Sequence, residues 1–252
     1  MYNFDEIIDR RHTNAMNTDG FRDYIFHADE SMVFPYKDEE FIRMWVADME
    51  FATPDVVIDG IRERLDKRIF GYTRVFENSY YEAFAAWCRR RYGWEFSKRE
   101  LVMSNGVIPA LFELVEYICA PDERVLFLTP SYAYFKYAAD HSRREYVCSD
   151  LINTDGHYTI DWDDFERKCA DEKTTLFIHC NPHNPSGRVW SAGSSSAWRR
   201  YSSGTACGSS RTRYTATCCA AAGRTRRSAK SCRTTAASSP AWRRARPSTW
   251  RA

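Results

Sequence analysis

The chain has 252 residues, which is enough for one sizeable domain or two small ones. Its formal net charge of +2 hides a split, because residues 191–252 carry 12 arginines and one lysine but no acidic residue. Residues 1–190 therefore hold 23 basic and 34 acidic side chains, a net charge of −11, which favours solubility and argues against a nucleic-acid surface.

Targeting segments and cysteines indicate the compartment. The N-terminal sequence MYNFDEIIDRRH is charged from the start, and no apolar run approaches the roughly 20 residues of a membrane span, so we expect a cytoplasmic protein. We expect free thiols in a reducing compartment at the five cysteines of residues 1–190, which are Cys88, Cys119, Cys148, Cys169 and Cys180. Four further cysteines in 191–252 lack the spacing of zinc ligands, so no metal site is predicted.

The first 190 residues alternate between helical and strand patterns. Residues 79–93 and 107–120 place apolar side chains at helical spacing, with a glycine ending the first helix and Pro109 in the first turn of the second. Residues 100–106 predict a short strand that ends in a polar turn. The remaining pattern predicts strands over 123–130, 144–150 and 174–180 and helices over 131–141 and 160–171.

This alternation predicts an α/β fold with a largely parallel sheet. Residues 123–130 and 174–180 are continuous apolar runs, typical of parallel strands that are buried on both faces. Ligands of such sheets bind beyond the carboxyl ends of the strands. We therefore expect the polar turns after 101–103, 126–129 and 176–180 to face one common site.

Three turns carry residue types that suit a ligand, and each has an ordinary alternative. The turn SNGVIPA (104–110) opens a helix whose free N–H groups suit a phosphate, although many strand-to-helix turns look alike. Tyr132 follows a strand end, where its ring either stacks on a planar cofactor or packs at a helix start. The sequence NPHNPSGR (181–188) fixes a rigid loop, which either presents an asparagine amide or is an ordinary turn.

In this order the motifs resemble those of the fold-type-I pyridoxal-phosphate enzymes, the aspartate-aminotransferase superfamily. Four segments are similar to the MalY/PatB group of cystathionine β-lyases, which are cysteine-S-conjugate C–S lyases: FDEIIDRRHTNAMNTDGF, MWVADMEFATPDVV, IFGYTRVFENSYYEAFAAWCRRRYGWE and NGVIPALFELVEYIC. The resemblance covers residues 4–190. It departs where the group has Lys-Trp after a Thr-Asn motif, because Asn17 and Thr18 follow Met16 here.

The resemblance implies the N-terminal part of the large domain of the pyridoxal-phosphate-transferase fold. It divides the chain into an N-terminal arm and helix (1–45), a partial cofactor-binding domain (46–190) and a disordered tail without predictable fold (191–252). A sheet that stops at 174–180 would leave that strand as an open apolar edge.

The resemblance also implies pyridoxal 5′-phosphate as cofactor and an amino acid as substrate. The backbone of Gly106 and Val107 would hold the phosphate, Tyr132 would stack on the pyridine ring, and Asn184 would hydrogen-bond its phenolic oxygen. Tyr72 would reach the phosphate of the neighbouring subunit, which implies a homodimer. The residues expected to line the substrate pocket are Trp45, Ala47 and Asp48, and His183 is expected to be loop scaffolding.

In this family a lysine forms a Schiff base with the cofactor and acts as base at the substrate Cα, while a carboxylate faces the ring nitrogen. β-Elimination then expels a thiol and leaves aminoacrylate, which hydrolyses to pyruvate and ammonia. The family carries these groups in Ser-Lys-Thr-Phe-Asn and Ser-Asp-Glu-Ile-His, and neither motif occurs in the 252 residues. Lys230, the lysine of the tail, lies in RRSAKSCRTT, which resembles neither motif. We therefore expect the chain as written to be inactive.

A shift of reading frame accounts for the tail. Codons that fit 242–252 read, one base out of register, as Met-Ala-Pro-Ser-Lys-Thr-Phe-Asn-Leu-Ala-Gly. Codons that fit 205–219 permit Gly-Val-Trp-Val-Val-Ser-Asp-Glu-Ile-His-Cys-Asp-Leu-Leu. Both missing motifs thus return in one frame, and we interpret the residues from about Ser191 onward as an out-of-frame product of a GC-rich gene. An arginine-rich tail also suits nucleic acid, but this one has no periodicity and no apolar face.

Three functional interpretations remain. The first is a C–S β-lyase, favoured by the segments WVADMEF and IIDRRHTN. The second is an aminotransferase of the same fold. The third, a non-catalytic fragment or regulatory binding protein, has no residue in its favour.

Overall fold

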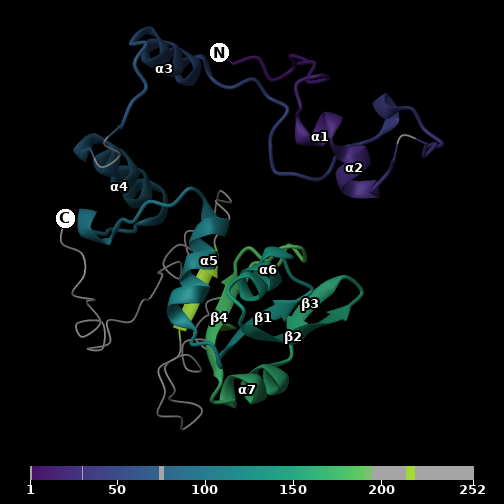
Figure 1. Ribbon diagram of the computed structural model, residues 1–252, viewed down its shortest axis with the longest axis vertical. Helices are drawn as coiled ribbons and strands as arrows, with labels where there is room; N and C mark the ends of the chain where they lie inside the picture. The colour runs from purple at the N-terminus through teal and green to yellow at the C-terminus, as the bar shows by residue number, and fades with distance from the viewer. Residues whose placement is uncertain (1, 30, 74–76, 192, 195–213, 219–252) are drawn as a thin grey trace. The chain divides into compact units, whose positions relative to one another are not determined.

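The computed structural model describes residues 2–29, 31–73, 77–191, 193–194 and 214–218. The chain forms two compact units, Met1–Thr73 and Arg74–Ala252, each described by itself (Figure 1). The boundaries expected from the sequence, at 45/46 and 190/191, stay predictions. The tail residues 192, 195–213 and 219–252 lie outside the described part, so the disorder expected of them stays a prediction.

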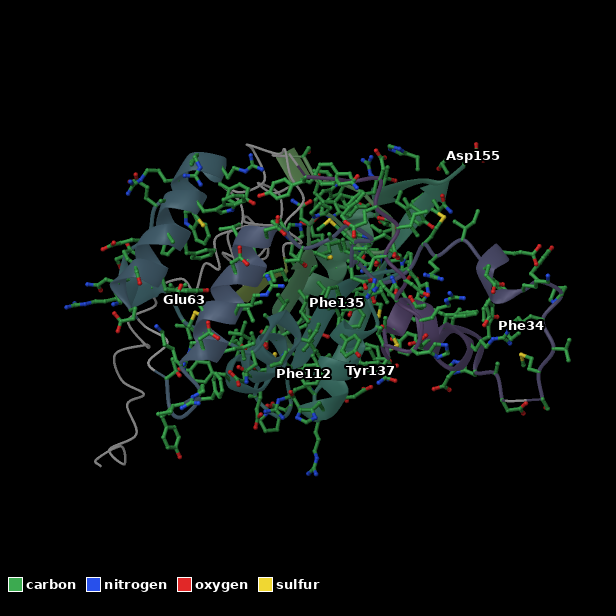
Figure 2. All side chains as sticks on the ribbon, turned by 90° about the horizontal axis from the view of Figure 1, so that it is seen from above. Phe34, Glu63, Phe112, Phe135, Tyr137 and Asp155 are labelled. Carbon is green, nitrogen blue, oxygen red and sulfur yellow. The ribbon has the colours of Figure 1, made fainter. Side chains whose placement is uncertain are left out.

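The first unit contains helices and an aromatic cluster that joins α2 to the segment 34–41. Its elements are α1 (Met16–Asp19), α2 (Phe21–Phe26), η1 (Asp38–Glu40) and α3 (Asp55–Asp66). Phe34, which is labelled in Figure 2, packs edge-on against Phe26 and Phe41, with ring centroids 5.0 and 5.8 Å apart. Phe21, whose ring lies 5.3 Å from that of Phe41, is 7% exposed. Aromatic packing of this kind stabilises a segment that has little aliphatic core of its own.

The second unit begins with α4 (Asn78–Tyr92), which ends as predicted at a glycine. Gly93 adopts the left-handed conformation with φ of 60°, and its N–H donates to the Arg89 carbonyl. The hydroxyl of Tyr81 donates to the Phe96 carbonyl at 2.6 Å and ties the helix to the chain that follows. In the described part of the chain, no helix combines the length and the apolar character needed to cross a bilayer.

The strand predicted over 100–106 is wrong. The structure has a 3₁₀ turn, η2 (Lys98–Glu100), followed by extended chain without sheet partners and a bend before Gly106. Val102 is 84% exposed there. A short apolar run becomes a strand only where a neighbouring strand pairs with it, and none does so among the residues described.

A mostly parallel sheet forms the centre of the second unit, with the order β3-β2-β1-β4-β5 (Figure 1). β1 pairs in parallel with β2 and β4, β4 pairs in parallel with β5, and β3 runs antiparallel to β2. This is the predicted α/β architecture with a largely parallel sheet, but the β2–β3 hairpin and β5 were not predicted, and the strand predicted over 100–106 is not part of it. The elements in chain order are α5 (Val107–Ile118), β1 (Arg124–Thr129), α6 (Tyr134–His141), β2 (Glu145–Thr154), β3 (His157–Ile160), α7 (Trp162–Ala170), β4 (Thr174–Cys180) and β5 (Tyr214–Cys218).

The sheet is buried on both faces, as the apolar runs predict. Successive side chains of a strand point to opposite faces, so Val125 and Phe127 join α5 and α6 in one core, while Leu126 and Leu128 join α7 in the other. Phe112 of α5 and Phe135 of α6 belong to the first layer (Figure 2). The five cysteines of residues 1–190 are free, as expected.

The hairpin between β2 and β3 was not predicted. Its two-residue loop, Asp155 and Gly156, has φ of 50° and 82°, and Asp155 lies at its tip (Figure 2). Gly156 N–H donates to Asn153 Oδ1 at 2.9 Å. An Asp-Gly pair with both φ values positive is a typical tight hairpin turn, and it was the available signal in the sequence.

The structure corrects the expectation of an open edge at 174–180. β4 is an interior strand, because β5, from the arginine-rich tail, pairs with it from Leu176↔Tyr214 to Cys180↔Cys218. An exposed strand edge offers unpaired backbone groups to any neighbouring segment. The sequence Tyr-Thr-Ala-Thr-Cys suits that role, because aromatic and β-branched residues are common in strands.

Candidate functional site

Three loops of the second unit lie at the same edge of its sheet. β1 and β4 are parallel neighbours, so Tyr132 and Asn184 follow strand ends on one side. α5 crosses the sheet in the opposite direction: after its last turn, Cys119 accepts hydrogen bonds from Thr175 and Arg144, which lie at the opposite, amino edge. The start of α5, at Gly106 and Val107, therefore lies at the carboxyl edge with the other two loops.

The start of α5 has free backbone donors. Gly106 precedes the helix with φ of 139° and ψ of 170°, a conformation open essentially to glycine alone, and no side chain caps the helix. Ser104 Oγ donates to the Gly106 carbonyl at 3.2 Å, which fixes the turn. The first N–H groups of an uncapped helix and its positive dipole end suit an anion such as a phosphate.

Tyr132 presents part of its ring at this edge. The side chain is 37% exposed, and its ring lies 5.1 Å from that of Tyr134 and 6.0 Å from that of Phe135, which belongs to the core. The ring thus contacts two aromatic neighbours. A partly exposed, well-supported ring of this kind suits stacking on a planar ligand.

Asn184 lies in the loop after β4, and this loop is bonded internally. His183 N–H donates to the Arg188 carbonyl, and Gly187 N–H donates to the His183 carbonyl, both at 2.7 Å. Asn184 N–H donates to Cys180 Sγ at 3.4 Å, while its side chain is exposed. An amide on a rigid loop is available to a ligand without an ordering cost.

His183 belongs to the interior of this loop. Its ring is 3% exposed, its Nδ1 lies 2.7 Å from Ser186 Oγ, and its centroid lies 5.5 Å from the ring of Trp190. Burial lowers the pKa of His183 and so favours a neutral ring. These contacts agree with the scaffolding role expected from the sequence, which stays a prediction.

Sequence reasoning missed two residues of this loop, Asn181 and Trp190. Asn181 Oδ1 accepts a hydrogen bond from the backbone N–H of Trp190 at 3.2 Å, and Trp190 Nε1 donates to the Cys180 carbonyl at 3.0 Å. The available signal in the sequence was the presence of two Asn-Pro dipeptides, because when one asparagine faces a ligand the other can hydrogen-bond within the loop.

The expected pocket residues Trp45, Ala47 and Asp48 belong to the first unit. The ring of Trp45 stacks on that of Tyr24 at 5.2 Å and 15°. Asp48 accepts hydrogen bonds from Arg10 and Asn17, and Ala47 is exposed. Val46, which lies between Trp45 and Ala47, has φ of 60°. This conformation is rare for a β-branched residue and marks locally stored strain.

Tyr72 also belongs to the first unit, and its side chain is fully exposed. The structure thus brings Gly106, Val107, Tyr132 and Asn184 to one edge of the sheet in the second unit. The roles expected of all eight residues stay predictions.

Fold and site together define a class of protein. The family model of aminotransferase class I and II matches residues 39–194, which is more than half of the chain. The chain belongs to this family. Its fold is mixed α/β with a mostly parallel sheet.

Named relatives narrow the comparison. Cystathionine beta-lyase PatB of Bacillus subtilis is 40% identical over 148 residues, covering 59% of this chain and 38% of the relative. Protein MalY of Escherichia coli is 26% identical over 190 residues, covering 75% and 46%. The PLP-bound C-S lyase from Staphylococcus hominis superposes with a TM-score of 0.72 and 46% identity, over 86% of this chain and 51% of that chain. The chain thus spans less than half the length of these two curated relatives.

Proposed function

We propose that this chain is the N-terminal part of a pyridoxal-phosphate-dependent C–S β-lyase. The reaction is β-elimination of cystathionine or a related cysteine S-conjugate to a thiol, pyruvate and ammonia. One observation carries the proposal: an uncapped helix start, a supported tyrosine ring and an exposed asparagine amide lie at one edge of a parallel sheet. The names of the relatives, which include a cystathionine beta-lyase and a C-S lyase, agree with it.

The donor set at this edge fits pyridoxal 5′-phosphate. Gly106 supplies the conformation that leaves the first N–H groups of α5 free, and these hold the phosphate. Tyr132 stacks on the pyridine ring, and the Asn184 side-chain amide donates to the phenolic oxygen, which keeps that oxygen ionised. When bound, this cofactor withdraws electrons from the substrate Cα. The protein's task is to orient it.

The first unit contributes the substrate pocket in this proposal. Trp45, Ala47 and Asp48 line it, with Asp48 held by Arg10 at 2.6 Å. Tyr72 reaches the phosphate site of a second copy, so the intact protein is a homodimer. The full exposure of Tyr72 in its own chain supports this role. The cytoplasmic location expected from the sequence stays a prediction.

We also propose that the 252-residue chain has no lyase activity. Neither Ser-Lys-Thr-Phe-Asn nor Ser-Asp-Glu-Ile-His occurs in it, so the chain supplies neither the lysine base nor the ring-nitrogen carboxylate. The family match ends at residue 194, close to the change of composition at Ser191, which supports a shift of reading frame there. Sequencing the gene across the codons for 184–252 tests the shift. An inserted or missing base near codon 191 is expected, and a DNA sequence without one contradicts it.

The activity is tested by comparing two proteins, the 252-residue chain and the product of a gene with the frame restored at codon 191. Each is incubated with pyridoxal 5′-phosphate and cystathionine. The restored protein is expected to release pyruvate stoichiometrically with thiol, and the 252-residue chain is expected to release none. Amino-group transfer to a 2-oxo acid without pyruvate release would instead identify an aminotransferase. Pyruvate release by the 252-residue chain would overturn the proposed inactivity.

A further inference from the structure

Trp190 closes the base of the Asn184 loop with two hydrogen bonds. One runs from its backbone N–H to Asn181 Oδ1 at 3.2 Å, and the other from its indole Nε1–H to the Cys180 carbonyl at 3.0 Å. Asn181 is 2% exposed and Trp190 is 6% exposed. The chain therefore leaves the sheet at Cys180 and is fastened to the same point again at Trp190. Buried hydrogen bonds of this kind are costly to break, because each broken bond leaves an unsatisfied polar group.

The same tryptophan anchors the loop in the hydrophobic core. Its ring belongs to the cluster that contains Leu126, Leu128, Phe165 and Phe177, on the α7 side of the sheet. Close-packed cores hold side chains in single positions. The base of the loop is thus as fixed as the sheet itself.

The outer part of the loop is held by hydrogen bonds of its backbone N–H groups. His183 N–H donates to the Arg188 carbonyl, Gly187 N–H donates to the His183 carbonyl, and Asn184 N–H donates to Cys180 Sγ at 3.4 Å. Asn184 is the exposed residue at the end of this series of contacts. Its backbone is held by Cys180, which is partly buried, and by its neighbour His183, which is buried.

We propose that Asn181 and Trp190 are a positioning pair for Asn184. They hold the loop in its binding conformation before any cofactor arrives, so that the amide of Asn184 meets the phenolic oxygen of pyridoxal phosphate without an ordering cost. The inference rests on the proposed function, because it assigns the loop to that cofactor. It adds two residues that touch neither cofactor nor substrate and act through Asn184.

The test uses the 252-residue chain and the variant Trp190→Phe, which keeps an aromatic ring but removes the indole donor. Trp162→Phe is the matched control, because Trp162 packs against the same core from α7. Equilibrium binding is measured with pyridoxal 5′-phosphate and with 3-deoxypyridoxal 5′-phosphate, which lacks the phenolic oxygen. Amide hydrogen exchange of residues 181–190 is followed without ligand.

We expect Trp190→Phe to bind pyridoxal 5′-phosphate about 5- to 10-fold more weakly, the equivalent of about one hydrogen bond. Affinity for the deoxy analogue stays unchanged, and the amides of His183 and Gly187 exchange faster. In an Asn184→Ala background, Trp190→Phe has no further effect on affinity. Asn181→Ala, which leaves the indole in place, gives the same pattern and serves if Trp190→Phe does not fold.

Other outcomes separate this inference from the proposed function. Equal weakening for both ligands, or a further loss in the Asn184→Ala background, means that Trp190 acts through general stability and overturns the inference. Unchanged affinity of Trp190→Phe and Asn181→Ala, with clear binding by the parent chain, overturns the inference alone. If the parent chain does not bind pyridoxal 5′-phosphate saturably, the proposed function fails, and this inference fails with it.

Discussion

Asn17 donates a hydrogen bond from Nδ2 to Asp48 Oδ1 at 3.1 Å, joining residues 31 positions apart. The same nitrogen lies 3.2 Å from Glu50 Oε1, and Asn17 is only 2% exposed. Asn17 stands in the segment where the MalY/PatB group, which the chain resembles, has Lys-Trp. Asn17, which departs from that pattern, therefore has a structural role in this chain, because it bonds Asp48, one of the three expected pocket residues.

Asn17→Asp is expected to destabilise the protein by about 1–3 kcal/mol at pH 7. It removes a buried donor and places a third carboxylate beside Asp48 and Glu50. Those neighbours raise the pKa of the new carboxyl in the folded state, so the loss is largest above that pKa and shrinks as the pH falls toward 4. Urea unfolding at several pH values measures it. Asn3→Asp adds the same charge at an exposed position and should change little; an equal loss in both variants contradicts the prediction.

Two glycine-to-alanine changes should act in opposite directions. Gly106→Ala is expected to cost about 1–3 kcal/mol, because φ of 139° strains any side chain, although the nearest atom to a new Cβ, Pro109 Cδ, is 3.7 Å away. Gly60→Ala, in the middle of α3 with open space around it, should stabilise by about 0.5–1 kcal/mol. Thermal or urea unfolding compares them. Equal effects would show that conformation is not what requires glycine at 106.

Asp164 connects α7 to β2 and gives a pH-dependent contribution to stability. It accepts hydrogen bonds from Ser149 Oγ at 2.7 Å and from Lys168 Nζ at 2.8 Å. Burial raises the pKa of Asp164, but these bonds outweigh it and bring the pKa below its ordinary range. The stabilisation is therefore complete above the unfolded pKa of about 4 and is lost as the pH falls through the folded value.

Asp164→Asn is accordingly expected to lower the free energy of unfolding by about 1–2 kcal/mol near pH 7. The parent chain and the variant should converge as the pH falls below about 4. Asp163→Asn removes the same charge from the same helix turn at an exposed position, so it is the matched control. A pH-independent difference between parent and Asp164→Asn would assign the effect to packing instead.

The pairing of β5 with β4 is tested by proline. Neighbouring residues of a strand point their N–H groups to opposite sides, so the double change Thr215→Pro and Ala216→Pro must remove one donor that faces β4. Amide exchange in residues 176–180 is expected to rise, while exchange in the β2–β3 hairpin stays constant. Unchanged exchange in β4 would show that β5 contributes no protection.

The sequence predicted best where a pattern is local and strong. β1 and β4 are continuous apolar runs, and α4 and α5 have clear helical spacing, so their existence and type followed directly. The strand predicted over 100–106 does not form, because strand pairing depends on a neighbouring strand that composition does not reveal. β5 was missed for the opposite reason: its tail lacks the aliphatic residues that mark buried strands.

Contacts between distant residues set the second limit. The bond between Asn17 and Asp48 spans 31 positions and follows no periodicity. The bond between Asn181 and Trp190 spans fewer positions, but the motif alone does not say which of the two asparagines serves the fold and which faces outward. Asn181 and Asn184 each stand in an Asn-Pro dipeptide, and only the three-dimensional fold shows which of them serves the fold and which faces outward.

The membership of Trp190 in the α7-side core has a consequence for mutational scanning. A library selected for cofactor retention would recover defects at Leu126, Leu128 or Phe177, although these side chains carry no chemistry. Such positions would score like binding residues in a functional screen and like ordinary core residues in an abundance screen. Comparing the two scores position by position would map the mechanical support of Asn184 without a single designed variant.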